Sequence, residues 1–343
     1  MGDVKNSLFL KNLRGEPTER TPIWVMRQAG RYLPEYQEVR KQYSFNEMCR
    51  TPEAACEVTL QPIRRFGFDA AIMFSDILTP LEAMGAPFDF SHGGPKLEKP
   101  VRTEAEIDAL HTYEPREGTS YVAEAIGMMK EGLGDTTPLI GFAGSPFTLA
   151  TYLIEGGGSK EFAELKTMLY RRPDLLDRLM AKLTDQTLAY LRMQVEAGVD
   201  AVQLFDTWGG ILHPRDYARV VLPCVRRIMD GLKDLGVPRI YFLKGSAPYL
   251  DLVTTLDVEA LGLDWTMDMA ATLPRLHGFA VQGNLDPLAL FGTDDEIRNR
   301  ALEICEAGAK AKGHVFNLGH GITPPTPIAA VETLVETVQG FRR

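Results

Sequence analysis

Cysteine and histidine are scarce in this sequence. Of its 343 residues, six are histidine and four are cysteine. No C-x-x-C pair occurs, nor any cysteine–histidine spacing typical of zinc ligands, so we expect no metal site. The cysteines indicate reduced, packed thiols rather than disulfides. They are Cys49, Cys56, Cys224 and Cys305.

Long apolar runs are also missing. No stretch approaches the roughly 18 residues that identify a membrane-spanning helix. Residues 1–16 lack the basic-then-apolar order of a secretory signal. We therefore expect a cytoplasmic chain without membrane insertion.

Positive charge is in the minority. Lysine and arginine number 37 and aspartate and glutamate 46, which gives a formal net charge of −9. Binding to nucleic acid requires a basic face, so we expect no nucleic-acid partner. A local group of arginines in so acidic a chain is informative, because it must reverse the sign of the field where an anionic ligand enters.

Short apolar runs alternate with longer helical patterns along the chain, which is 45% hydrophobic. Two of the longer helical patterns cover residues 45–66 and 214–235, and a Gly/Pro-rich stretch at 85–100 predicts a surface loop or small hairpin. Eight strands, each followed by helix, predict an α/β fold: a single (β/α)8 TIM barrel with extra helices and loop insertions, forming one domain over residues 1–343. The predicted strands are residues 22–26, 69–74, 138–142, 200–205, 239–243, 260–263, 280–282 and 314–317.

The alternative is a doubly wound sheet with a second domain. No G-x-G-x-x-G follows the first predicted strand, and no linker-like or low-complexity stretch divides the chain. The barrel is therefore the favoured architecture.

Polar side chains follow one predicted strand after another. In a barrel of this kind the active site lies at the carboxyl ends of the strands, so these residues are candidates for a site. The competing explanation is that loops are polar everywhere. The residues are Arg27, Arg31, Asp76, Ser145, Asp206, Thr207, Lys244, Asp264, Asn284 and His320.

The first strand leads into an unusual group of arginines. Arg27 and Arg31 lie four residues apart around Gly30, and Arg40 follows. A solvated turn is one explanation. The other is a binding site for a ligand with several carboxylates, because a guanidinium is always charged and grips a carboxylate with two parallel hydrogen bonds.

Three further side chains have two open interpretations each. Asp76 could bind donors or stabilise a cation, or it could cap the helix that follows it. His320 lies between two glycines and suits a ligand contact or a proton-transfer role as well as a plain loop position. Tyr152 could present its hydroxyl to a pocket or fill the core.

Two segments of the sequence are distinctive: residues 22–32, PIWVMRQAGRY, and residues 141–149, GFAGSPFTL. They resemble the first and second signatures of the uroporphyrinogen decarboxylase family of haem biosynthesis, and the resemblance covers essentially the whole chain. Residues 74–78, 151–157 and 317–322 resemble further family blocks. One departure is Thr207, where some members carry serine; either hydroxyl can donate and accept, so the role is unaffected.

The resemblance implies a homodimer that needs no metal or organic cofactor. It implies the stepwise loss of four acetate carboxyls from uroporphyrinogen III to give coproporphyrinogen III. Asp76 would hold the pyrrole nitrogens and stabilise a cationic intermediate, and Arg27 would position a carboxylate and is a candidate proton donor. The residues expected to bind substrate are Arg27, Gln28, Ala29, Gly30, Arg31, Arg40, Asp76, Tyr152, Thr207 and His320.

Two rival functions remain open. Zinc-dependent methyltransferases that act with corrinoids resemble this chain overall, but they carry a His-x-Cys pair, and here the sequence His314-Val315-Phe316 has no cysteine at that place. A non-catalytic tetrapyrrole carrier would keep the arginines and release its ligand unchanged.

Overall fold

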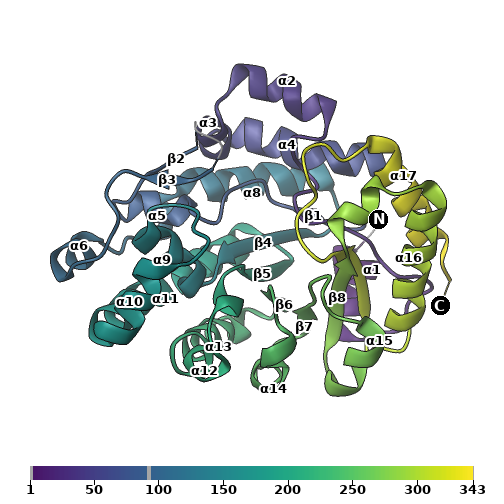
Figure 1. Cartoon of the computed structure of the whole chain (residues 1–343). Coiled ribbons are helices and arrows are strands. Elements are labelled where there is room, and N and C mark those ends of the chain that lie inside the picture. Colours follow the sequence, from purple (N-terminus) through teal and green to yellow (C-terminus); the bar gives the residue numbers. More distant parts are fainter. Residues whose placement is uncertain (1–2, 91–93, 343) are drawn as a thin grey trace.

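A curled sheet of seven parallel strands forms the centre of the computed structural model, which describes residues 3–90 and 94–342 (Figure 1). The strand order is β1-β4-β5-β6-β7-β8-β9, so neighbours along the chain are also neighbours in the sheet. The predicted α/β barrel class is confirmed, with seven regular strands instead of eight. The strands are β1 (Ala71–Ile72), β4 (Leu139–Gly144), β5 (Ala201–Asp206), β6 (Arg239–Leu243), β7 (Ala260–Gly262), β8 (Ala280–Leu285) and β9 (His314–Leu318).

The predicted strand at residues 22–26 is wrong as a regular strand, although the segment fills the eighth position. The Phe316 N–H of β9 donates to the Pro22 carbonyl at 2.8 Å, and the Asp69 N–H just before β1 donates to the Ile23 carbonyl at 2.9 Å. Only an isolated parallel bridge, between Ile23 and Phe316, results. The segment thus lies between the two edge strands of the sheet.

Side chains explain why this segment forms no ladder. The Ile23, Val25 and Met26 N–H groups donate to the side chains of Asp69, Gln28 and Asn317 at 2.9, 3.2 and 2.9 Å. Pro22 has no N–H to donate. Only the Trp24 N–H bonds to a neighbouring strand, at 3.3 Å from the Phe316 carbonyl of β9, and side chains satisfy the other three donors.

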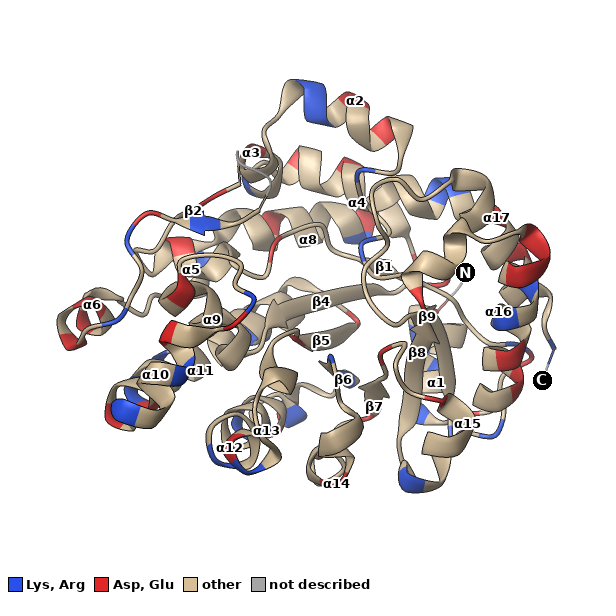
Figure 2. Ribbon diagram, viewed as in Figure 1, with Lys and Arg blue, Asp and Glu red and all other residues tan. Residues whose placement is uncertain are grey.

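Helices surround the sheet, and charged residues lie mostly on them while the strands are almost free of charge (Figure 2). The helices are α1 (Leu8–Arg14), α2 (Pro34–Gln42), α3 (Phe45–Arg50), α4 (Pro52–Phe66), α5 (Thr79–Ala83), α6 (Glu104–Ala109), α7 (Pro115–Gly118), α8 (Ser120–Leu133), α9 (Pro146–Glu155), α10 (Ala163–Arg171), α11 (Pro173–Ala197), α12 (Pro214–Val220), α13 (Leu222–Asp230), α14 (Leu250–Val253), α15 (Met269–Thr272), α16 (Asp294–Gly308) and α17 (Ile328–Gly340).

Proline divides the two predicted helices over residues 45–66 and 214–235. The helix over 45–66 breaks at Thr51, whose backbone is extended (φ −100°, ψ 106°), because Pro52 disfavours helical geometry in the residue before it. The helix over 214–235 breaks before Pro223, and a 3₁₀ turn over Lys233–Leu235 replaces its end. Helices α1 and α2 escaped prediction.

A small hairpin occupies the Gly/Pro-rich stretch, as predicted for residues 85–100. Strands β2 (Phe88–Asp89) and β3 (Lys96–Leu97) pair antiparallel, with Phe88 opposite Leu97. The residues between 90 and 94 lie outside the described part of the chain. Within the described part, no helix is long and apolar enough to cross a membrane.

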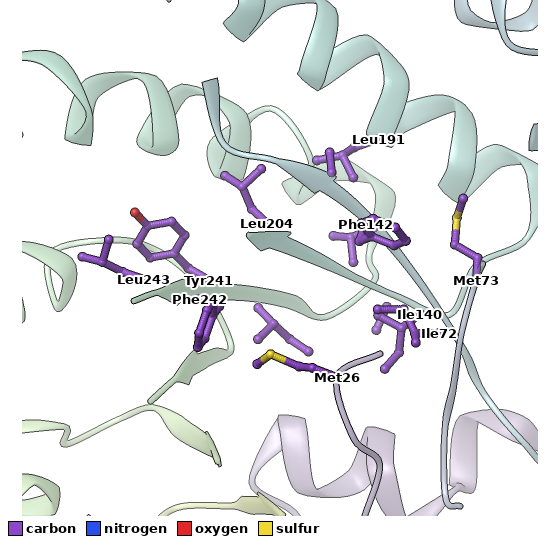
Figure 3. Packing of buried hydrophobic residues seen from close by; sticks show 14 of the residues in the cluster. Met26, Ile72, Met73, Ile140, Phe142, Leu191, Leu204, Tyr241, Phe242 and Leu243 are labelled. Carbon is purple, nitrogen blue, oxygen red and sulfur yellow. The ribbon is translucent and has the colours of Figure 1, made fainter. Parts of the chain in front are cut away.

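The core fills the space between the strands and the helices around them (Figure 3). Among its buried side chains are Met26, Ile72, Phe142 and Phe242, which come from the irregular first segment, β1, β4 and β6. The same four side chains also line the cavity described next. The apolar wall of the cavity is thus continuous with the core.

Candidate active site

A cavity of about 490 Å³ opens at the carboxyl ends of the strands. Its lining includes residues within or just after β1, β4, β5, β6 and β9. The hairpin contributes Phe90, Gly94 and Pro95. The cavity therefore lies where barrel enzymes place their chemistry.

Three arginines line this cavity without an ionic partner. Arg27 and Arg31 are exposed and Arg40 is half-buried. Across residues 3–90 and 94–342, no ion pair involves any of the three, whereas Arg20 forms a bidentate pair with Asp69 at 2.8 and 2.6 Å. Their charge is available to an anionic ligand.

Arg27 has an uncommon backbone conformation. Its φ of +63° places a non-glycine residue in the left-handed region. Such a conformation is unfavourable and persists only where its surroundings enforce it. The N–H groups of the two preceding residues, Val25 and Met26, donate to the side chains of Gln28 and Asn317, so the backbone that leads into the turn is fixed.

Asp76 is half-buried in the cavity lining, after β1. Its Oδ1 accepts from the Leu78 N–H at 2.8 Å, and among the described residues no donor reaches Oδ2. Burial raises the pKa of Asp76, while the Leu78 N–H and the Arg27 charge act in the opposite direction. Asp76 both caps the turn that leads into α5 and keeps one oxygen available as an acceptor.

His320 follows β9 and its ring lies against two aromatic rings. The ring centroids are 6.3 Å from those of Phe242 and Trp265. Burial lowers the pKa of His320 to about 4, helped by the charges of Arg27 and Lys244 and opposed by Asp264. The imidazole is therefore neutral near pH 7 and can donate one hydrogen bond and accept another.

Tyr152 and Thr207 bring two hydroxyl groups to the cavity lining from α9 and the end of β5. The Tyr152 ring makes edge contacts with Phe88 and Trp208, at centroid distances of 6.4 and 6.3 Å. Burial raises the pKa of the Tyr152 phenol, so its proton stays in place. Each group can donate a hydrogen bond to a ligand carboxylate.

Of the ten residues expected to bind substrate, all except Gln28 line the cavity. Five other candidates that follow predicted strands do not line it: Ser145, Asp206, Lys244, Asp264 and Asn284. Ala29 and Gly30 line the cavity, but Gln28 is fully buried and does not. Its Nε2 donates to the Ala70 carbonyl at 3.1 Å, and its Oε1 accepts from the Val25 N–H. Gln28 shapes the backbone that presents the neighbouring arginines.

Asp206 is a buried brace beside the cavity rather than part of its lining. It accepts from the hydroxyls of Ser145, Thr148 and Tyr241 at 3.0, 2.8 and 2.8 Å, and from the Gly209 N–H at 3.0 Å. Burial raises the pKa of Asp206 despite these donors. Two of the polar residues that follow predicted strands, Ser145 and Asp206, thus hold the loops in place.

Several lining residues were not anticipated from the sequence. Tyr36 escaped because helix α2 was missed, and Phe90 because the hairpin was placed on the surface. Phe45 begins a helix that was predicted, but nothing in the sequence marked it as a cavity residue. Thr323 and Pro324 directly continue the block of residues 317–322, which was a usable signal. Among residues 3–90 and 94–342 no group of three histidine, cysteine, aspartate or glutamate side chains is arranged to hold a metal ion.

Comparison with known proteins decides the family. A sequence profile described as uroporphyrinogen decarboxylase (URO-D) matches residues 4–341. The chain belongs to the uroporphyrinogen decarboxylase family. The family expected from the sequence is thereby confirmed.

Curated family members match over nearly the full length. The chain is 48% identical to the uroporphyrinogen decarboxylase of Syntrophotalea carbinolica, with 96% of each chain covered. It is 49% identical to that of Myxococcus xanthus, with 97% of this chain and 96% of the relative covered.

Solved structures support the fold alone. A methyltransferase from Methanosarcina mazei superposes with a TM-score of 0.84 at 20% identity, covering 99% of both chains. A B12-independent methionine synthase from Shewanella sp. W3-18-1 reaches a TM-score of 0.59 at 12% identity, with 94% of each chain covered.

Proposed function

We propose that this chain is a carboxy-lyase of tetrapyrrole biosynthesis. It removes the four acetate carboxyls of uroporphyrinogen III in turn as carbon dioxide and yields coproporphyrinogen III. One observation carries the proposal: the open acceptor oxygen of Asp76 shares a cavity with three arginines that form no ion pair within the described part of the chain.

The substrate suits this distribution of charge. Uroporphyrinogen carries eight carboxylates around its rim and four pyrrole N–H groups at its centre. Arg27, Arg31 and Arg40 bind rim carboxylates, and Tyr152, Thr207 and His320 add neutral hydrogen bonds. Asp76 accepts from the central N–H groups, so the ligand is held at its edge and at its middle.

The chemistry uses the substrate's own ring as the electron sink. A proton adds to the pyrrole carbon beside nitrogen, next to the carbon that bears the acetate arm, so the ring becomes cationic and the arm-bearing carbon shares the positive charge. The bond between the methylene carbon and the carboxylate then breaks, carbon dioxide leaves, and the electron pair neutralises the ring. The methylene carbon takes up a proton to become methyl, and loss of the ring proton restores the pyrrole. Each cycle consumes one proton and needs no cofactor.

Asp76 stabilises the cationic intermediate, and Arg27 orients the carboxylate that leaves. A carboxylate placed beside a developing positive charge in a water-poor site lowers the barrier directly. Arg27 is also the candidate donor of the first proton, although a guanidinium holds its protons tightly.

We further propose that the whole chain acts as one domain, forms a homodimer and works in the cytoplasm. The family resemblance supports the last two proposals.

Anaerobic incubation with uroporphyrinogen III tests the function. The expected result is release of carbon dioxide together with products of seven to four carboxylates. Return of unchanged ligand would indicate a carrier instead. Stoichiometric zinc in the purified protein, with no carbon dioxide formed, would favour methyl transfer.

A further inference from the structure

A lysine lies between two tryptophans beside the cavity. Lys244 directly follows β6, and its Nζ is 5.6 Å from the ring centroid of Trp208 and 5.7 Å from that of Trp265. A cation within about 6 Å of an indole ring is attracted by the electrons of that ring. The ammonium group is therefore held in place from two sides.

The backbone under Lys244 is fixed as well. Its N–H donates to the Asp206 carbonyl at 3.1 Å. A Cβ on Gly210 would lie 2.1 Å from the Lys244 carbonyl oxygen, so the loop after β5 packs directly on this residue. The position of the lysine is built into the fold from neighbouring strand ends.

The charge of Lys244 has no ionic partner in the described part of the chain. The nearby carboxylate of Asp264 already accepts from the Gly245 N–H at 2.5 Å and the Ser246 N–H at 3.3 Å. Its other oxygen accepts twice from Thr266. A half-buried cation without a counter-ion, beside an anion site, is a natural place for a further anionic group.

The two tryptophans connect this lysine to the cavity lining. Trp208 packs on Tyr152 and Trp265 packs on His320, each at a ring distance of 6.3 Å. Tyr152 and His320 line the cavity and Lys244 does not. A ligand group that reaches Lys244 must therefore extend past the cavity lining.

We propose that Lys244, Trp208 and Trp265 form a further subsite, which binds the carboxylate of one propionate arm of the substrate. The proposal rests on the proposed function. A propionate arm is the longer of the two kinds of arm, and its methylene groups suit the faces of the indole rings while its carboxylate meets the ammonium. The arm is unchanged by the reaction, so the subsite holds substrate and product alike.

Lys244→Met tests this subsite, because it removes the charge and keeps most of the apolar stem. The KM for uroporphyrinogen III and the inhibition constant of coproporphyrinogen III should both rise about tenfold, because this is the loss of affinity expected when a charge-assisted hydrogen bond is removed from a half-buried site. The kcat should change by less than about twofold, because equal loss of binding in ground and transition states leaves turnover intact. Lys244→Arg should recover most of the affinity.

Lys310→Met is the matched control. Lys310 is exposed between α16 and β9, at the amino end of the strands and thus at the opposite end of the sheet from the cavity. This variant should leave KM, kcat and product inhibition unchanged.

Three results would overturn the subsite. They are unchanged affinity in a Lys244→Met protein that melts at the wild-type temperature, a fall in kcat alone, and a rise in KM without weaker product binding. The first result would show that Lys244 does not contact the ligand. The second would show that Lys244 only supports Tyr152 and His320. The third would show that Lys244 contacts an acetate arm, which the product lacks. Direct titration of both proteins with coproporphyrinogen III keeps this test separate from the proposed function, since the titration needs no turnover.

Discussion

The side chain of Arg27 lies directly over Gly321. A Cβ placed on Gly321 would come within 2.4 Å of the Arg27 Cδ and 2.8 Å of its Nε. Gly321 does not have the positive φ that excludes other residues, so its lack of a side chain matters chiefly for this contact. Arg27 belongs to the first segment that resembles the family, residues 22–32, and Gly321 to the last, residues 317–322. Their contact therefore brings the first and last parts of the barrel sequence together at the site.

Gly321→Ala should therefore displace the Arg27 side chain and lower kcat/KM about tenfold or more, because small misplacements of a positioning group cost much of the rate. Steady-state kinetics under anaerobic conditions measure this effect. Gly127→Ala is the control, since a Cβ at this position in α8 meets nothing within 4 Å. Equal activity of the two variants would show that the contact with Arg27 is unimportant.

Asp76→Asn should still bind uroporphyrinogen but lose most of its turnover. The amide keeps the shape and one acceptor oxygen, but it lacks the negative charge that stabilises a cationic ring. Binding by titration and turnover by carbon dioxide release separate the two effects. Near-normal turnover would remove Asp76 from the mechanism.

The same substitution should stabilise the fold at neutral pH. Burial raises the pKa of Asp76 above its value in the unfolded chain, so folding favours the protonated form. The unfolding free energy therefore falls as pH rises through the interval between the two values, and the cost persists above it. Asp76→Asn lacks this cost and should gain about 1 kcal/mol at pH 7, as functional carboxylates often oppose stability. Thermal unfolding of both proteins measures the difference; a lower melting temperature for the variant would contradict it.

The rule that barrel sites follow the strands was right for half of its candidates, because five of the ten polar residues after predicted strands line the cavity. Asp76 and Asp206 both follow an apolar strand, yet one lines the cavity and the other is enclosed by four donors. Nothing local distinguishes them, because the difference lies in partners from other strands. Gln28 is similar: it lies between cavity residues in sequence, but its carboxamide meets Ala70 in the core.

The prediction of a regular strand failed where side chains replaced backbone hydrogen-bond partners. The segment of residues 22–26 has the apolar pattern of a strand, and it lies where a strand is needed. Three of its N–H groups donate to the side chains of Asp69, Gln28 and Asn317, and Asp69 and Asn317 come from distant parts of the chain. Hydrophobic pattern predicts the position of such a segment but cannot predict these partners.

His320 should titrate well below ordinary histidine. Its pKa is about 4 because burial and the charges of Arg27 and Lys244 disfavour the imidazolium. In the folded chain this pKa lies below the unfolded value, so the stability from the neutral ring is complete above about 6.5 and is lost as pH falls toward 4. NMR of labelled histidine, assigned with His320→Asn, should show a neutral ring at pH 6. Arg27→Gln should raise this pKa. A resonance that titrates near 6.5 in the wild type would contradict the burial.

Arg31 provides the sharpest test of recognition by charge. It is exposed, no described residue pairs with its side chain, and its carbonyl accepts from Gln37 regardless of that side chain. Arg31→Glu should therefore leave the fold intact and raise the KM for uroporphyrinogen by roughly 10- to 100-fold, because repulsion replaces attraction at close range. Added salt should narrow the gap to wild type, since it screens exposed charges.

Lys310→Glu makes the same change of net charge at the amino end of the strands and should leave KM unaltered. If both reversals raised KM equally, attraction by the chain as a whole would explain binding. If neither did, the arginines at the cavity would have no part in it. An effect of Arg31→Glu alone would show that an acidic protein attracts a polyanion through the local field of its cavity, against the sign of its total charge.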